Sequence, residues 1–101
     1  MALAEADRPN GPSYGWQASL LMYYVYLLQS ESNPKQVYAG STRDLRQRLR
    51  QHNDGRSPHT AKFRPWTLVA YFAFAQENTD VAFENYLKSG SGRAFVKRHF
   101  L

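Results

Sequence analysis

Three runs of apolar and aromatic residues divide the chain into predicted strands. Residues 23–28 (Tyr-Tyr-Val-Tyr-Leu-Leu) are aromatic and β-branched, which favours a buried strand. A turn-rich stretch over residues 29–35 leads into residues 36–41, which predict a second strand antiparallel to the first. Residues 67–75 form the third run and are apolar enough for a strand in the middle of the sheet.

Polar and apolar positions between the second and third strands predict a helix followed by a basic loop. Ser41, with the acidic Asp44 three residues later, indicates a capped helix start. The helix should run to about His52 and end at the turn over residues 53–55. Residues 54–66 are basic and contain proline, which is typical of a loop.

Two further helices are predicted after the third strand. Thr79 or Asp80 could cap a helix that runs to about Lys88, and the Ser-Gly-Ser-Gly sequence over residues 89–92 should end it. Residues 93–101 then predict a short basic terminal helix. The predicted order is β-β-α-β-α-α, which indicates an α+β fold with helices packed on a small sheet.

The first 21 residues differ from the rest of the chain. They contain two prolines and two glycines and have no sustained periodicity, so we expect residues 1–21 to be a flexible N-terminal extension of a single domain over residues 22–101. No apolar run is long enough to span a bilayer, and the start lacks the pattern of a signal peptide. We therefore expect a cytoplasmic protein with no membrane partner.

Composition narrows the chemistry. The chain has 101 residues and no cysteine, which excludes disulfides, cysteine-based zinc sites and thiol catalysis. Its net charge is +5, and residues 22–101 carry 12 of the 13 basic and 6 of the 8 acidic side chains. This excess favours phosphate-rich partners such as nucleic acid, although many small proteins are basic without any such partner.

The first predicted helix places one arginine apart from the others. With Arg48 at 0° and about 100° per residue, His52 falls at about 40°, Leu45 at about 60° and Leu49 at about 100°. Arg48 and His52 should therefore lie at the edge where the helix meets the sheet. A guanidinium held there needs an anion, and either a structural salt bridge or a phosphate would satisfy it.

The tyrosines of the first two strands could add to such a site. Tyr24 and Tyr26 share one face of their strand, and Tyr38 lies in the neighbouring strand just before Gly40, which permits close backbone approach. Two phenols near one arginine could bind a water molecule or a phosphate oxygen. Ordinary core tyrosines with satisfied hydroxyl groups would give the same pattern.

Glu84 lies at the border of the apolar face of the second predicted helix. It could form a surface pair with Lys88 one turn later, which would contribute only a few tenths of a kcal/mol. Its carboxylate could also bind a hard divalent cation. Spacing alone favours the surface pair.

Taken in order, these segments resemble the GIY-YIG nuclease family. The resemblance rests on Tyr24-Val25-Tyr26, on Tyr38-Ala39-Gly40, on an arginine helix over residues 41–53 and on a glutamate helix over residues 82–88. Residues 89–95 are similar to those of small stand-alone bacterial members. The chain departs from the family pattern at Tyr24, where the family has glycine, at Ala39, and in having no asparagine over residues 90–101.

The resemblance implies a three-stranded antiparallel sheet flanked by helices and hydrolysis of a phosphodiester with Mg²⁺ or Mn²⁺. It implies that Tyr26 helps to deprotonate the attacking water, that Tyr38 orients water or phosphate and that Arg48 stabilises the phosphoryl oxygens. Glu84 would hold the metal, and His52 would hydrogen-bond the phosphate or a tyrosine. Because a phenol has a pKa near 10, we expect Arg48, the metal and Lys35 to favour the phenolate.

The predicted function is a metal-dependent endonuclease that acts on DNA in repair or recombination. A non-catalytic nucleic-acid-binding module with the same fold is the alternative, and a protein-interaction domain is a third hypothesis. A homodimer or a partner protein could supply specificity, because so small a domain buries a limited interface. The basic residues predicted to bind nucleic acid are Lys35, Arg43, Arg56, Lys62, Arg64, Lys88, Arg93, Lys97 and Arg98.

Overall fold

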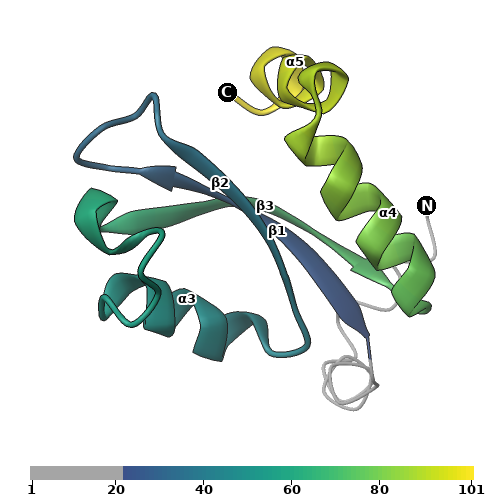
Figure 1. Cartoon of the computed structure of the whole chain (residues 1–101), viewed down its shortest axis with the longest axis horizontal. Coiled ribbons are helices and arrows are strands. Elements are labelled where there is room, and N and C mark those ends of the chain that lie inside the picture. Colours follow the sequence, from purple (N-terminus) through teal and green to yellow (C-terminus); the bar gives the residue numbers. More distant parts are fainter. Residues whose placement is uncertain (1–21) are drawn as a thin grey trace, which may run out of the picture.

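The computed structural model describes residues 22–101, so the extension predicted over residues 1–21 lies outside the described part. The elements follow the chain as β1 (Tyr23–Ser30), β2 (Val37–Thr42), α3 (Leu45–Asn53), a 3-10 turn η1 (Ala61–Phe63), β3 (Trp66–Phe74), α4 (Glu77–Lys88) and α5 (Gly90–His99). This order confirms the predicted α+β fold. Helix α3 covers one face of the sheet, and α4 and α5 lie on the other (Figure 1).

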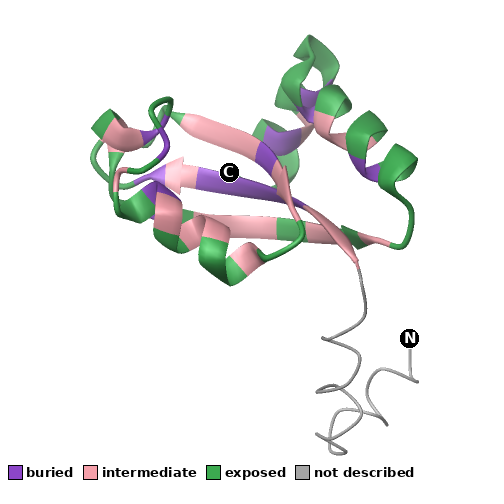
Figure 2. Ribbon diagram, turned by 60° about the horizontal axis from the view of Figure 1, so that its bottom comes forward, coloured by how far each residue is buried: buried purple, intermediate pink, exposed green. Residues whose placement is uncertain are grey.

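The sheet is antiparallel in the order β2-β1-β3, as the family resemblance implied, but the central strand is β1. The prediction that β3 lies in the middle was wrong. Consecutive residues of β1 from Val25 to Leu28 are at most 1% exposed, because helices cover both faces of this strand (Figure 2). Strand β3 has exposed positions at Thr67, Tyr71 and Ala73, which suits an edge.

Alternating residues of β1 serve two separate cores. Val25 and Leu27 pack with Leu87 of α4 and Val96 of α5 on one face. Tyr26 and Leu28 pack on the other face with Trp66 and with the apolar side of α3, which includes the predicted core residues Leu45 and Leu49. The period-2 alternation of the strand therefore places the Tyr26 ring on the α3 side.

Helix α3 begins later than predicted, because a different residue caps it. The Asp44 side chain accepts a hydrogen bond from the backbone N–H of Gln47 at 3.1 Å, so Asp44 is the N-cap. Ser41 and Thr42, the expected start of the helix, remain in β2 and pair with β1. The predicted cap at Ser41 was therefore wrong.

Helices α4 and α5, in contrast, begin earlier than predicted. Helix α4 starts after Gln76, so neither Thr79 nor Asp80 is its cap. The break after α4 is a single residue, Ser89, whose hydroxyl caps α5 through the N–H of Gly92 at 3.1 Å. A Cβ at Gly92 would lie 1.8 Å from the carbonyl oxygen of Tyr86, so only glycine allows this sharp junction. Within the described residues, no helix has the length and apolar character to cross a membrane.

Candidate functional site

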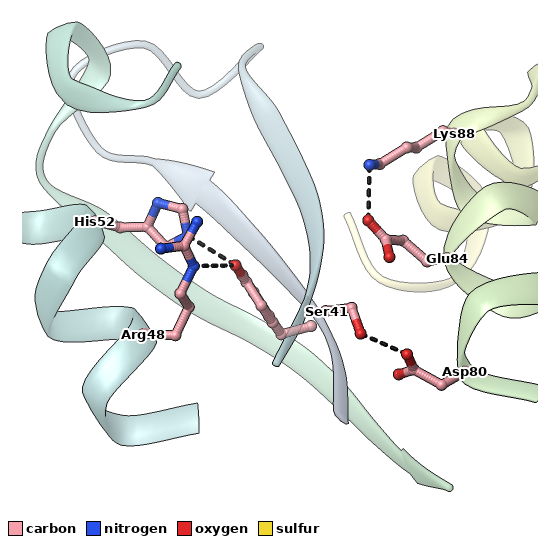
Figure 3. Close-up of polar contacts among 7 residues, drawn as sticks. Ser41, Arg48, His52, Asp80, Glu84 and Lys88 are labelled. Carbon is pink, nitrogen blue, oxygen red and sulfur yellow. Dashed lines mark hydrogen bonds and ion pairs between the residues drawn. The ribbon is translucent and has the colours of Figure 1, made fainter. Parts of the chain in front are cut away.

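Four polar side chains on the α3 side of the sheet form one hydrogen-bonded chain. The Nε–H of Arg48 donates to the Tyr26 hydroxyl oxygen at 3.3 Å, and that oxygen lies 2.8 Å from Nε2 of His52. Nδ1 of His52 lies 2.7 Å from the Thr60 hydroxyl, which donates to the carbonyl oxygen of Ser57 at 3.4 Å. Figure 3 shows Arg48 and His52 converging on the phenol.

These contacts fit a neutral imidazole that carries its proton on Nδ1. In this tautomer Nδ1 of His52 donates to the Thr60 oxygen, and the Thr60 hydroxyl donates to the carbonyl oxygen of Ser57. Nε2 of His52 then carries no proton and accepts from the Tyr26 hydroxyl, whose oxygen accepts from Arg48. The arrangement therefore runs from a guanidinium donor through a phenol to a neutral imidazole.

A glycine and a second tyrosine complete the surroundings of the phenol. Gly40 of β2 is the partner of Tyr26 in the strand register, and a Cβ at Gly40 would lie 2.5 Å from the Tyr26 hydroxyl oxygen. The absent side chain therefore lets the Tyr26 phenol lie over β2, the close approach expected from the sequence. The Tyr38 ring packs 6.2 Å from the Tyr26 ring and 5.0 Å from the His52 ring.

The environment of Tyr26 opposes the expected phenolate. Burial raises the pKa of Tyr26 to about 12, because desolvation of the charged form outweighs the hydrogen bond from Arg48 that lowers it. Lys35, which we expected to favour the phenolate, lies in a groove beside α5 and is not among the groups that shift the Tyr26 pKa. Tyr26 is thus a neutral phenol at neutral pH.

His52 is kept neutral by the same surroundings. Its side chain is fully buried, and burial together with the positive charge of Arg48 lowers its pKa to about 4. A neutral imidazole can accept the Tyr26 proton at physiological pH. The prediction that His52 lies beside Arg48 and bonds a tyrosine agrees with these contacts.

The lowered pKa of His52 predicts a loss of stability in acid. A histidine with a pKa of about 4 when folded and near 6.5 when unfolded stabilises the fold fully above pH 6.5, and this contribution is lost as the pH falls toward 4. The loss should amount to about 3 kcal/mol between pH 7 and pH 4. The free energy of unfolding of His52→Gln, measured by urea titration, should therefore fall less steeply over this range than that of the parent.

The matched control is His59→Gln, which makes the same side-chain change at an exposed position. This variant should retain the pH dependence of the parent protein. Identical profiles for the parent and His52→Gln would contradict a buried neutral imidazole.

Arg48 has no carboxylate within ion-pair distance among residues 22–101, so the structural salt bridge considered for it is absent there. Its Nη1 donates to the side-chain oxygen of Gln51 at 2.9 Å, and its Nε to Tyr26. The guanidinium also interacts with Tyr38, and Tyr26 and Tyr38 together raise the pKa of Arg48. A half-buried cation with donors to spare is suited to an oxygen anion from outside the chain.

Glu84 reaches the site from the opposite layer. Helix α4 lies across the sheet from α3, and the Glu84 side chain extends from it toward the strands (Figure 3). Its carboxylate pairs with Nζ of Lys88 at 2.7 Å, the surface pair that spacing favoured. Glu84 contacts neither Arg48 nor Tyr26, but its negative charge is among the influences that raise the Tyr26 pKa. The structure thus brings together Tyr26, Tyr38, Arg48 and His52, and leaves Glu84 across β2.

The only metal ligand predicted from the sequence is therefore a single carboxylate. Within residues 22–101, no group of three or more histidine, cysteine, aspartate or glutamate side chains could hold a metal ion. Mg²⁺ usually binds one or two carboxylates and completes its shell with water and substrate phosphate oxygens. The half-buried Glu84 carboxylate fits an ion shared with a bound phosphate rather than a cage made by the protein.

The predicted nucleic-acid-binding residues fall into two regions. Lys35, Lys88, Arg93 and Lys97 line one groove on the α4–α5 side. The others lie outside this groove: Arg43 covers the Tyr23 ring at 4.3 Å, Lys62 covers the Phe63 ring at 5.3 Å, Arg64 donates to the carbonyl oxygen of Ala61 at 2.8 Å, and Arg56 and Arg98 are exposed.

Sequence reasoning missed several residues that support the site. Thr60 and Ser57 lie in a loop that carried no signal beyond its basic and proline residues, yet they orient His52. Asn53 fixes the end of α3 to β3, because its side chain accepts from the N–H of Trp66 at 2.6 Å. Asp80 was considered only as a cap, but it is buried and accepts a 2.5 Å hydrogen bond from Ser41.

Several fungal proteins are similar to the chain. The chain is 41% identical over 73 residues to the structure-specific endonuclease subunit SLX1 of Debaryomyces hansenii, covering 65% of the chain and 21% of that protein. It is 40% identical over 91 residues to the protein of the same name from Scheffersomyces stipitis, covering 76% and 27%. The chain therefore spans about a quarter of the length of these relatives. They give no support to the similarity with bacterial stand-alone members suggested by residues 89–95.

A solved structure with partial similarity is the UPF0213 protein of Bacillus halodurans, with a TM-score of 0.48, 26% identity and coverage of 76% of this chain and 83% of that one. The family described as the GIY-YIG catalytic domain matches residues 22–98, which include β1, β2, α3 and α4 with every residue of the hydrogen-bonded chain. The chain therefore belongs to the GIY-YIG catalytic domain family.

Proposed function

We propose that the protein is an endonuclease that hydrolyses phosphodiester bonds in DNA, in repair or recombination. The observation that carries this proposal is the chain from Arg48 through Tyr26 to a neutral His52. It places an anion-binding cation and a proton acceptor each within hydrogen-bond distance of one phenol. The relatives, each called a structure-specific endonuclease subunit, support the same reaction class.

Arg48 would bind the phosphate to be cleaved. The guanidinium has more N–H donors than the two that bind Tyr26 and Gln51, so a remaining donor can reach a phosphoryl oxygen while Nε stays on Tyr26. A bound phosphodiester would thereby lie beside the Tyr26 hydroxyl. Burial is the main cause of the low His52 pKa, and the charge of Arg48 is the smaller one; a bound phosphate would offset this smaller part and raise the His52 pKa.

Tyr26 would act together with His52, because its own pKa of about 12 makes a free phenolate rare at neutral pH. As the water attacks phosphorus, the Tyr26 oxygen takes up a water proton while the phenolic proton moves to Nε2 of His52. The bond between Thr60 and Nδ1 then holds the imidazolium in place. Tyr38 lies close enough to both rings to orient the water or the phosphate.

Glu84 would hold a divalent metal ion, Mg²⁺ or Mn²⁺, which when bound stabilises negative charge on the phosphate and on the leaving oxygen. For this role the Glu84 carboxylate must release Nζ of Lys88, which lies 2.7 Å away. The Lys88 side chain is half-exposed. A solvent-exposed ion pair contributes little to stability, so replacing Lys88 by a metal ion costs little free energy.

We also propose that a partner protein or a second copy of the chain contributes to substrate choice. The relatives are named as subunits, which indicates assembly for those proteins. A domain of this size buries only a limited area on DNA, so additional contacts would raise its specificity.

The alternative is a non-catalytic nucleic-acid-binding module. The raised pKa of Tyr26 and the pairing of Glu84 with Lys88 favour it, because both hold potentially catalytic groups in inactive forms. Against it stands the buried hydrogen bond between Tyr26 and a neutral His52, which binding alone does not require.

A cleavage assay tests the proposed function. Labelled duplex, flap, junction and single-stranded DNA, each incubated with the full chain and Mg²⁺ or Mn²⁺, should give internal cuts, with substrates that contain a junction cut most rapidly. Binding to these substrates without any cut, in either metal, would leave the binding module as the function.

A further inference from the structure

A groove of about 1020 Å³ lies on the α4–α5 side of the sheet, beside the β1–β2 turn and β2. Four cations line it: Lys35 comes from the turn, Lys88 from α4, and Arg93 and Lys97 from α5. All four side chains are exposed. We call this surface, defined by these four residues, the basic groove.

Two further properties distinguish the basic groove from an ordinary basic surface. No acidic side chain is among the described residues that line it, although four of the 12 basic residues of the domain gather there. Between the cations it is lined by apolar side chains, of which Leu101 is exposed and Val37 and Tyr38 are half-buried, above the buried Leu87 and Val96. Cations around an apolar lining suit a ligand that carries both phosphates and flat apolar surfaces.

We propose that the basic groove binds an unpaired strand of nucleic acid that continues from the candidate cleavage site. This inference rests on the proposed endonuclease function. In a duplex the base faces are stacked inside, so a protein meets mainly phosphates and groove edges. In an unpaired strand the bases are free to lie on an apolar surface while the phosphates meet cations.

The size of the basic groove agrees with this occupant. Pockets of about 300–1,000 Å³ hold a ligand of drug size, so about 1020 Å³ offers room for roughly two or three nucleotides. The occupant would therefore be a short single-stranded segment, such as a flap or one arm of a branch.

The basic groove adjoins the residues proposed for cleavage. Lys88 lines the groove and also binds the Glu84 carboxylate at 2.7 Å. Tyr38 lines it as well, and its ring packs 5.0 Å from His52. Tyr38 belongs to the edge strand β2, so a strand that leaves the groove would pass around this edge to reach a phosphate held at Arg48 on the other face. A phosphate on Lys88 would compete with Glu84 for that cation.

Binding measured by fluorescence anisotropy tests the proposal. The full chain in EDTA, which prevents metal-dependent cleavage, is titrated with a duplex that carries a single-stranded tail and with a blunt duplex that has the same number of phosphates. We expect the tailed DNA to bind about tenfold more tightly, and Lys35→Glu with Lys97→Glu to remove this preference. Because each single-strand phosphate contact contributes about −0.7 to the salt slope, the loss of two should reduce the slope by about 1.4.

The matched control is Arg46→Glu with Arg50→Glu, which makes the same charge change on exposed positions of α3, across the sheet. It should retain the preference for the tail, and melting curves confirm that both variants fold. The proposal is overturned if the groove variant keeps the preference for the tail or if the control variant loses it equally. It is also overturned if polyglutamate and single-stranded DNA of equal charge compete equally well against the tailed DNA.

Cleavage in Mg²⁺ is measured separately, so the two failures can be told apart. Cleavage by a protein without tail preference would leave the endonuclease and remove the groove assignment. A tail preference that depends on Lys35 and Lys97, without cleavage of any substrate, would leave the groove and remove the endonuclease.

Discussion

Replacing Glu84 by glutamine should reduce DNA cleavage by about a thousandfold or more and leave the fold unchanged. Glutamine keeps the size and shape of the side chain but removes the charge that would attract a divalent metal ion. The exposed pair with Lys88 is the only ion pair of Glu84 within residues 22–101, and its loss should lower the free energy of unfolding by no more than about 0.5 kcal/mol. Initial rates of cleavage and urea titrations measure the two effects.

Glu77→Gln is the matched control, because Glu77 lies in the first turn of the same helix and is exposed. It should cleave as the parent does. EDTA should abolish the cleavage by the parent and by Glu77→Gln alike. If Glu84→Gln retained metal-dependent cleavage within tenfold of the parent, the metal would be held elsewhere.

The order of helices and strands could be predicted because it depends on local patterns. The aromatic and β-branched run of β1 and the periodicity of α3 are properties of neighbouring residues. The position of a strand within the sheet depends instead on which faces other elements cover. That is why the apolar composition of β3 was mistaken for a central position, which belongs to β1.

The first helix start illustrates how tertiary contacts override a local signal. Ser41 and Asp44 fit a capping pattern, but Ser41 pairs with Val25 in the sheet and its hydroxyl donates to the buried Asp80. Asp44, the next suitable oxygen, becomes the cap. Ser41 could satisfy hydrogen bonds either as a helix cap or as a strand residue. The register of β2 on β1 decides between these two roles.

The candidate site was partly predictable for the same reason. The helical wheel placed Arg48 and His52 at the edge of the sheet, and both side chains do converge on Tyr26. The direction of the Tyr26 pKa shift depends on whether burial, which raises the pKa, outweighs the hydrogen bond from Arg48, which lowers it. The extent of burial cannot be obtained from the sequence, and in the structure burial has the larger effect. The contribution of Thr60 depends on a loop conformation that no periodic pattern predicts.

Replacing Arg48 by alanine should also reduce cleavage by about a thousandfold, since it removes the donors proposed to bind the phosphoryl oxygens. The effect on stability should be small, because Arg48 makes no ion pair within residues 22–101 and loses only its bonds to Tyr26 and Gln51. We expect a loss of about 1 kcal/mol in the free energy of unfolding. Arg50→Ala, at an exposed position of the same helix, should cleave as the parent does.

A third measurement separates a lost phosphate ligand from a general disturbance of the site. The positive charge of Arg48 helps to lower the pKa of His52, so Arg48→Ala should raise that pKa above about 4, while burial continues to hold it below the ordinary value. Titration of the imidazole by NMR measures the shift, and Arg50→Ala should show none. A variant that loses cleavage, keeps its melting curve and raises the His52 pKa would locate the lost charge beside the imidazole. If cleavage were lost together with the fold, Arg48 would be a structural residue and the phosphate site would have to be sought elsewhere.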